Sequence, residues 1–222
     1  MIHLMRSSAA VLLVLVVLGG CSILPERAPK QTFMLPPPNL AALQAAPIPL
    51  TLRILTPHVE PPLNGSGILV NPEGQIIKAY KGARWQKPIP LLLRDHWIDG
   101  LRQAGRLAAV VHETSDADGD LSLASDLSLF HLKYPQNTPV VVIQVDAQLL
   151  ESNTRQVLAT RRFRVQQAVP DQPASALIDG FGAVSQALAK DLSHWLEGVT
   201  REYVRETDHP RPPSGTGSST IK

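Results

Sequence analysis

The sequence predicts an α+β fold in which two helices pack on one face of a mostly antiparallel sheet. First, apolar and polar side chains alternate in several short runs of residues 50–169, which is the period of a half-buried strand. Second, residues 89–104 and 174–199 carry apolar side chains at every third or fourth position, as amphipathic helices do. Third, the last strand-like runs are separated by short connections, which favours antiparallel pairing.

The first part of this domain contains short strands. Apolar residues alternate with threonine and arginine in residues 50–54. Residues 68–70 and 75–80 flank Asn71-Pro72-Glu73-Gly74, a sequence typical of a tight turn, so we predict a hairpin there. A further short strand is predicted at residues 107–111.

Three longer strands follow, at residues 121–134, 140–150 and 156–169, and we expect them to form a meander. The apolar residues of the first change parity near Phe130, which predicts a bulge or a twist at that point.

Each predicted helix has its own signals. Pro88 and Pro90 stand where proline is tolerated at a helix start, and Gly105 is a typical stop. The second helix should end near Val199. Its apolar stripe comprises Leu177, Phe181, Val184, Leu188, Leu192, Trp195 and Val199.

The N-terminus carries the pattern of a secreted lipoprotein. Arg6 gives the start a positive charge, and residues 9–18 form an apolar run too short to span a membrane, so residues 1–20 are predicted to be a signal peptide. Residues 18–21, Leu-Gly-Gly-Cys, resemble a bacterial lipobox, whose cysteine is acylated before signal peptidase II cuts in front of it. We therefore expect Cys21 to be lipidated. An ordinary signal peptide and an uncleaved anchor are the alternatives.

Lipidation has consequences for location. Two or three acyl chains hold a protein on a membrane, whereas one chain holds it only marginally. In Gram-negative lipoproteins an Asp after the lipidated cysteine often means retention in the inner membrane. Here that residue is Ser22, so we expect an anchor in the outer membrane, facing the periplasm.

Composition divides the chain into four segments: residues 1–20, the lipoprotein signal peptide; 21–49, a lipidated proline-rich tether; 50–199, a single α/β domain; and 200–222, a tail expected to be disordered. The prolines of the tether disfavour both a sheet interior and a long helix, so we expect an extended segment. Alternatively, part of the tether packs on the domain, with residues 33–35 as an edge strand.

Composition also excludes several functions. The net charge of +2 is too small to predict nucleic-acid binding, and the single cysteine excludes an intramolecular disulfide and a cysteine-rich zinc module. The histidines lack metal-site spacing, and His96 and His194 are expected to be partly exposed or paired. Residues 116–120, Asp-Ala-Asp-Gly-Asp, lack the downstream positions of a calcium loop and are expected to form a solvated loop. We assign no catalytic, cofactor or metal residue.

A basic run, Lys78, Lys81, Arg84 and Lys87, lies beside Trp85. It could contact lipid phosphates or an acidic partner, although a solvated strand end is the simpler interpretation. Trp85 is either an exposed interface anchor or, as we favour, a core residue packed against the first helix.

Residues 80–92 resemble the signature of the ABC-type transport auxiliary lipoproteins (PqiC/YmbA-like). The resemblance rests on Tyr80, the pair Arg84-Trp85, the proline-containing helix start and the leucines that follow. The lipobox, the proline-rich lead, the meander and the closing helix fit too, so the resemblance covers about residues 21–199. Many members have Tyr-Tyr where this chain has Thr32-Phe33, which weakens the expectation of a fixed strand there.

The resemblance implies a non-enzymatic adaptor. Its partners would be an MCE-domain tunnel protein and, through it, an inner-membrane permease and ATPase, in a system that moves lipids or maintains membrane integrity. Tyr80, Arg84 and Trp85 are then partner contacts or core residues. Whether the chain forms a homo-oligomer is left open. One alternative is a periplasmic carrier that holds an acyl chain between sheet and helices, and another, disfavoured, is a lipid-anchored hydrolase.

Overall fold

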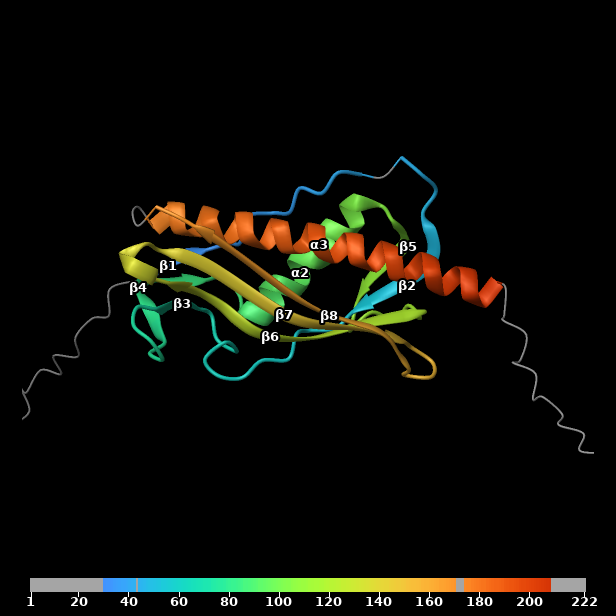
Figure 1. Cartoon of the computed structure of the whole chain (residues 1–222), viewed down its shortest axis with the longest axis horizontal. Coiled ribbons are helices and arrows are strands. Elements are labelled where there is room, and N and C mark those ends of the chain that lie inside the picture. The colour runs from blue at the N-terminus through green and yellow to red at the C-terminus, as the bar shows by residue number, and fades with distance from the viewer. Residues whose placement is uncertain (1–29, 43, 171–173, 209–222) are drawn as a thin grey trace, which may run out of the picture.

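The structure, a computed structural model, describes residues 30–42, 44–170 and 174–208 (Figure 1). The predicted signal peptide, Cys21 and the tail from residue 209 lie outside the described residues. Within them, eight strands form one sheet: β1 (Gln31–Phe33), β2 (Ile48–Ile54), β3 (Gly67–Asn71), β4 (Lys78–Trp85), β5 (Leu107–His112), β6 (Leu121–Lys133), β7 (Val140–Glu151) and β8 (Val157–Ala168). Two helices, α2 (Ile89–Ala104) and α3 (Ala174–Asp208), and a short 3-10 turn (Pro135–Asn137) complete the fold.

The sheet is mixed, which corrects the expectation of a mostly antiparallel one. The hairpin β3–β4 and the meander β6–β7–β8 are antiparallel, whereas β1–β4, β2–β5, β2–β6 and β3–β6 are parallel. Short turns can only produce antiparallel neighbours, while long connections return the chain to the same end of the sheet. The connection from β2 to β5 is of this long kind, because it contains β3, β4 and helix α2. Strand β5 then runs parallel to β2.

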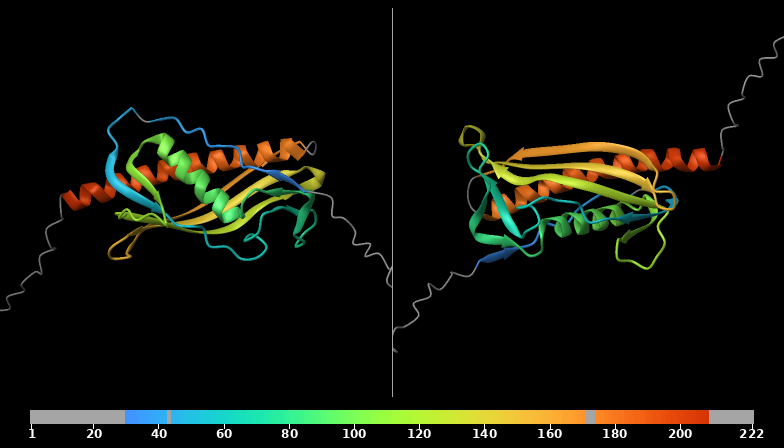
Figure 2. Two further views of the ribbon diagram at one scale, coloured as in Figure 1. Left: turned by 180° about the vertical axis from the view of Figure 1, so that it is seen from behind. Right: turned by 90° about the horizontal axis from the view of Figure 1, so that it is seen from below.

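Both helices lie on the same side of the long β6–β7–β8 ribbon, as the sequence predicts (Figures 1 and 2). Helix α3 packs along β7 and β8, and α2 packs against α3 and β5. Every helix among the described residues is too short or too polar to cross a membrane.

The layer between helices and sheet is filled by fully buried side chains. Trp85 meets the rings of Phe130 and Phe181 edge-on, at centroid distances of 6.0 and 5.2 Å, and all three are 0% exposed. Because interiors pack at crystal-like density, these three rings fill their part of the layer and leave no room beside them for an acyl chain.

Two local predictions are confirmed. The register of β6 and β7 shifts between Leu127 and Leu129, where the change of apolar parity predicts a bulge. Helix α2 ends at Gly105, whose φ of 60° is left-handed and whose N–H donates to the carbonyls of Leu101 and Arg102.

Helix α3 continues to Asp208, beyond the predicted end at Val199. Tyr203 follows Val199 by four positions and extends the same stripe, partly buried against the core. Arg201 pairs with Glu197 one turn earlier, at 3.0 Å, which favours the added turns. Residues 200–208, which were predicted to belong to a disordered tail, are therefore helical.

The segment predicted to be a tether is docked on the domain from Lys30 onward. Strand β1 pairs with β4, and Phe33 lies opposite Trp85. Pro36 lies over Gly182 of α3, and Leu40 lies over Gly100 of α2. Proline lacks a donor, but its ring is apolar and packs where a glycine leaves room for it. This part of the segment therefore packs on the domain with an edge strand, as the alternative expectation had it, and is not a free tether.

Candidate functional site

The residues singled out from the sequence have different environments on β4. Trp85 is 0% exposed, so it contributes to the core and presents no surface to a partner. Tyr80 is partly buried against the core. Arg84 is exposed, and its Nε donates to Thr32 Oγ1 at 3.2 Å, which ties β1 to β4. Cys21 lies outside the described residues.

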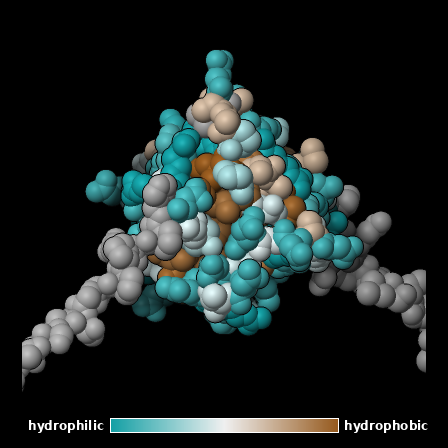
Figure 3. Space-filling model, turned by 90° about the vertical axis from the view of Figure 1, so that its right-hand side faces the viewer, coloured by the Kyte–Doolittle hydropathy of each residue, from teal (hydrophilic) through white to brown (hydrophobic). Residues whose placement is uncertain are grey.

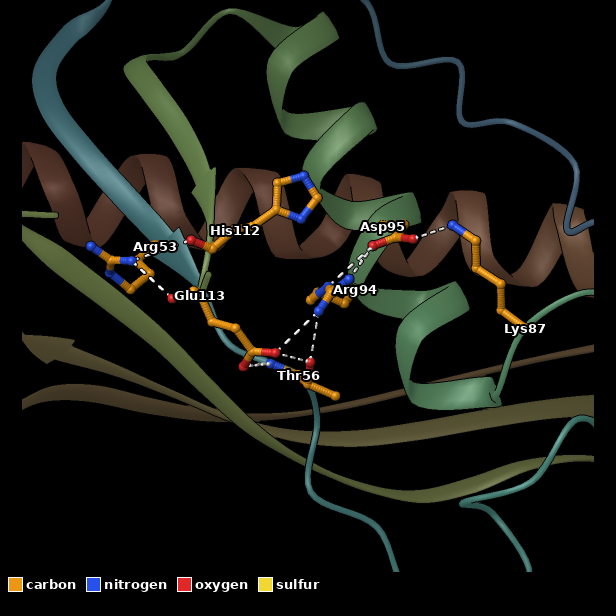
Figure 4. A network of polar contacts seen from close by, with 7 residues as sticks. All are labelled: Arg53, Thr56, Lys87, Arg94, Asp95, His112 and Glu113. Atoms are coloured by element: carbon orange, nitrogen blue, oxygen red, sulfur yellow. Dashed lines mark hydrogen bonds and ion pairs between the residues drawn. The ribbon is translucent and has the colours of Figure 1, made fainter. Parts of the chain in front are cut away.

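A polar network joins the ends of β2 and β5 to helix α2 (Figure 4). Arg94 Nη1 donates to Thr56 Oγ1 at 2.9 Å and to Glu113 Oε1 at 3.1 Å, and the Thr56 amide donates to Glu113 Oε2 at 2.9 Å. Arg94 also pairs with Asp95, which in turn pairs with Lys87 at 2.7 Å. Each charge in the network therefore has an opposite charge within reach.

The charges of this network explain how it holds α2 in place. Burial raises the pKa of Glu113, but hydrogen bonds from Thr56 and the charge of Arg94 outweigh burial and hold that pKa below its ordinary value. An acid that stays ionised at neutral pH cannot serve as a general acid. The arrangement therefore fixes α2 to the strand ends, with Glu113 as an ionised acceptor.

The acidic loop at residues 116–120 is organised by protein groups. Asp120 Oδ2 accepts a hydrogen bond from the Thr51 amide at 2.7 Å. Arg53 Nη1 donates to the carbonyls of His112, Glu113 and Ser115 at 3.0 to 3.3 Å. Across the described ranges, no three His, Cys, Asp or Glu side chains are placed to hold a metal ion together.

The two helical histidines differ. His194 is exposed, and its Nδ1 lies 2.9 Å from the Lys190 carbonyl. His96 is 5% exposed, so the expectation that it is partly exposed is wrong. Its Nε2 lacks a hydrogen-bond partner, while backbone groups of Pro36 and Ser185 act on the ring. Burial lowers the pKa of His96 to about 4, although Asp99 acts in the opposite direction. His96 is therefore neutral at physiological pH.

An apolar pocket of about 540 Å³ opens between β6, the loop before β3 and the β3–β4 hairpin. Leu63, Leu69, Ile77 and Leu129 supply much of its wall, and His58 and Asp126 contribute polar groups. Neither helix lines it. Its volume is within the range of about 300–1,000 Å³ that small-molecule sites occupy.

One end of the molecule, which we call the α3 end, comprises residues 195–208 of α3 and the start of β8. Seen end-on, this side shows hydrophobic side chains in a hollow ringed by hydrophilic ones (Figure 3). A groove of about 330 Å³ runs between the helix and the strand, lined by Leu158, Val199 and Tyr203 among others. Because the sequence predicted a helix end at Val199, this surface was not predicted, although the spacing from Val199 to Tyr203 could have revealed it.

The opposite side carries what we call the β4 edge, meaning Lys30 and residues 76–84. Lys30, Lys78, Lys81 and Arg84 are exposed there. The described chain begins at this edge, because Gln31 pairs with Ala83. In Figure 1 the start of β1 and the C-terminal half of α3 lie at opposite ends of the molecule.

Among curated proteins, no match is found. Among solved structures, a Xanthomonas campestris protein assigned to the family DUF330 is similar at 23% identity and a TM-score of 0.72, over 80% of this chain and 99% of that chain. The crystal structure of an uncharacterized protein is similar at 16% identity and a TM-score of 0.59, over 76% of this chain and 99% of that chain. At these identities the likeness shows a shared fold.

A family model described as "ABC-type transport auxiliary lipoprotein component" matches residues 33–193, which is well over half of the chain. The match begins at the last residue of β1 and ends within α3, so it includes α2 and the strands β2 to β8 in full.

Proposed function

Because this chain belongs to the family of ABC-type transport auxiliary lipoprotein components, we propose that it is the lipid-anchored periplasmic adaptor of an MCE-type lipid-transport system. Its direct partner would be the MCE-domain tunnel protein, and through it an inner-membrane permease and ATPase. The membership bears out the resemblance inferred from residues 80–92. The outer membrane, the MCE partner and the adaptor role are the proposal.

One observation supports an adaptor most directly: the start of the described chain and the α3 end lie at opposite ends of the domain (Figure 1). An adaptor needs one side toward its membrane anchor and another toward its partner. A lipid on Cys21 would reach Lys30 through a stretch that spans at most about 30 Å when extended. The β4 edge would then face the membrane, and the α3 end would face the periplasm.

The α3 end has the composition expected of a contact surface. Its groove combines Leu158, Val199 and Tyr203 with the carboxylates of Glu202 and Glu206. Interfaces commonly have an apolar, tyrosine-containing centre and a polar rim. We therefore propose that the tunnel protein binds here.

The anchor and the partner are tested separately. Cys21→Ala should release the protein from the membrane fraction and abolish acyl-chain labelling, because no second lipidation site is expected. A variant that still sediments with membranes and still takes up label contradicts the anchor.

Partner binding is tested by capture of the purified MCE-domain protein on the native lipidated protein. Tyr203→Ala combined with Val199→Ala should weaken capture about tenfold or more, since hot-spot residues contribute about 2 kcal/mol. Met34→Ala is the control, because Met34 is 68% exposed and lies next to β1. Equal loss in both variants contradicts the assigned surface, and no capture by the unmodified protein contradicts the MCE partner.

A lipid carrier is the second candidate, and the 540 Å³ apolar pocket favours it. Ile77→Trp should fill this pocket from the hairpin. Mass spectrometry of lipids that copurify with the protein should then show a lipid that the variant loses; equal lipid in both proteins removes this candidate.

A further inference from the structure

The β4 edge is open along most of its length. On its outer side β4 pairs with β1 only at Ala83, Arg84 and Trp85. Within the described ranges, no strand covers residues 78–82 on that side. Gly82 has a φ of 76°, so the strand is irregular where the cover ends. This leaves a stretch of exposed strand beside the point where the described chain begins.

The charges on this edge have one sign and lack counter-charges. Lys30, Lys78, Lys81 and Arg84 form no ion pair with any described residue. The adjacent Lys87 is different, since it pairs with Asp95 at 2.7 Å. A row of four uncompensated cations attracts an anionic surface, and the attraction is screened by salt.

Large apolar side chains accompany these cations. Ile76 is 48% exposed and Ile77 is 37% exposed, directly before Lys78 in the hairpin. Met34, next to β1, is 68% exposed. Cations together with exposed apolar side chains are the combination that holds a protein at the interface of an anionic bilayer, where the charges meet phosphates and the apolar groups enter the headgroup boundary.

We propose that the β4 edge is a second membrane contact, which lays the domain against anionic phospholipid headgroups. The inference rests on the proposed lipid anchor, because the chain between Cys21 and Lys30 is short. An anchor on that chain keeps the edge within about 30 Å of the bilayer. Binding is then intramolecular, so a contact too weak to recruit a free protein suffices. The result is a fixed orientation, with the α3 end directed away from the membrane.

The edge could instead be basic only because exposed strands need lysines to prevent aggregation. The two explanations differ in what the hairpin touches. If the lysines serve only as protection, Ile76 stays in water beside any membrane. If the edge is a contact, Ile76 enters the headgroup region of anionic vesicles.

The test uses the native lipidated protein in vesicles of phosphatidylcholine, with or without phosphatidylglycerol. Because acylation consumes Cys21, Ile76→Cys supplies the one free thiol for an environment-sensitive dye. Val157→Cys is the matched control, since Val157 is 46% exposed and lies at the α3 end. We expect a blue shift and quenching by lipid-borne nitroxide at position 76 in anionic vesicles, reduced by added salt, and neither effect at position 157.

A second pair of variants tests the charges. Lys78→Gln with Lys81→Gln should abolish the blue shift at position 76. Arg155→Gln with Lys190→Gln removes the same charge from exposed positions elsewhere and should leave the shift unchanged. Loss of the shift in both pairs contradicts a specific edge contact.

The anchor and the contact fail in distinguishable ways. If the protein does not float with vesicles and Cys21 takes the dye, the lipid anchor is wrong and this inference falls with it. If the protein floats but position 76 reports water, or both positions report lipid, the anchor stands and the β4 contact is overturned.

Discussion

The two halves of α3 share one apolar period but have different surroundings. In the first half, a Cβ on Gly180 would lie 2.3 Å from Val169, and one on Gly182 would lie 2.6 Å from Pro36, so neighbours approach the helix very closely. In the second half, a Cβ on Gly198 would meet nothing within 4 Å, and Val199 and Tyr203 are only partly buried. An apolar stripe therefore identifies the face of a helix that points toward the domain, but it does not show which part of that face is fully buried. The first half is closely enclosed by its neighbours, whereas the second half leaves Val199 and Tyr203 partly exposed, at the surface where we propose that the partner binds.

The largest effect should come from the aromatic cluster in which Trp85 of β4 packs against Phe181, in the first half of α3. Trp85→Ala should lower the free energy of unfolding by about 3–5 kcal/mol, because Trp85 is fully buried against Phe130 and Phe181. Tyr203→Phe, on the second half, removes one hydrogen bond to Glu151 and should cost about 1 kcal/mol. Chemical denaturation measures both. Similar costs for the two variants would break the contrast between the halves.

The next effect is a dependence on pH at His96, which lies near the backbone of Pro36 and of Ser185 in α3. Burial lowers its pKa from 6.5 to about 4, so the unfolded chain binds the proton more readily. The contribution of neutral His96 to the free energy of unfolding is fully present above pH 6.5 and is lost as the pH falls toward 4. The free energy of unfolding should therefore be lower by about 2 kcal/mol at pH 5 than at pH 7.5.

Unfolding of the unmodified protein and of His96→Gln, measured from pH 8 to pH 5, checks this. The variant should lose most of the slope, while His131, whose pKa burial also lowers, retains a smaller part. If the free energy of unfolding of the variant depends on pH as strongly as that of the unmodified protein, His96 is not the source of the pH dependence.

A matched pair of glycine substitutions compares the halves directly. Gly182→Ala should cost about 1–2 kcal/mol, because the added methyl displaces Pro36. Gly198→Ala should instead stabilise the protein by about 0.5–1 kcal/mol, since alanine favours a helix and nothing obstructs it. Thermal unfolding of the two proteins side by side gives the signs. Two changes of the same sign would mean that the halves do not differ as described.

The smallest effect concerns an ion pair on the second half. Arg106 pairs with Glu197, and their side chains are 17% and 19% exposed. Glu197→Gln should cost about 1 kcal/mol, whereas Glu202→Gln, in a pair with Arg205 that is mostly exposed, should cost close to nothing. Denaturation at low and high salt separates them. A larger cost at Glu202 would indicate that the helix end is held more firmly than its contacts suggest.

Local features of the fold could be predicted from the sequence because their causes are local. The parity change at Phe130 requires a bulge, and Gly105 is the residue type that a left-handed helix end favours. Strand order could not be predicted in the same way. The parallel pairing of β2 with β5 and β6 depends on connections that cross the sheet, and alternation within a strand does not identify its neighbours.

The docked segment shows a second limit on what the sequence predicts. Its prolines predict an extended chain, and the chain is extended, but Gly100 and Gly182 open the places where Leu40 and Pro36 lie. Those glycines are sixty or more positions away in sequence from the residues that lie over them, so no local pattern connects the two. At the candidate site, the basic run of β4 was visible in the sequence, whereas its position on an open edge was not.

The orientation of the domain between membrane and partner is the central claim, and site-specific photo-crosslinking in intact cells tests it most directly. A photoreactive residue in place of Tyr203 should crosslink to the MCE-domain tunnel protein, and one in place of Ile76 should crosslink to lipid and not to that protein. Both positions are accessible in the structure, since Ile76 is 48% exposed and Tyr203 lines the groove of the α3 end. Crosslinks to the tunnel protein from position 76, with none from position 203, would contradict the account.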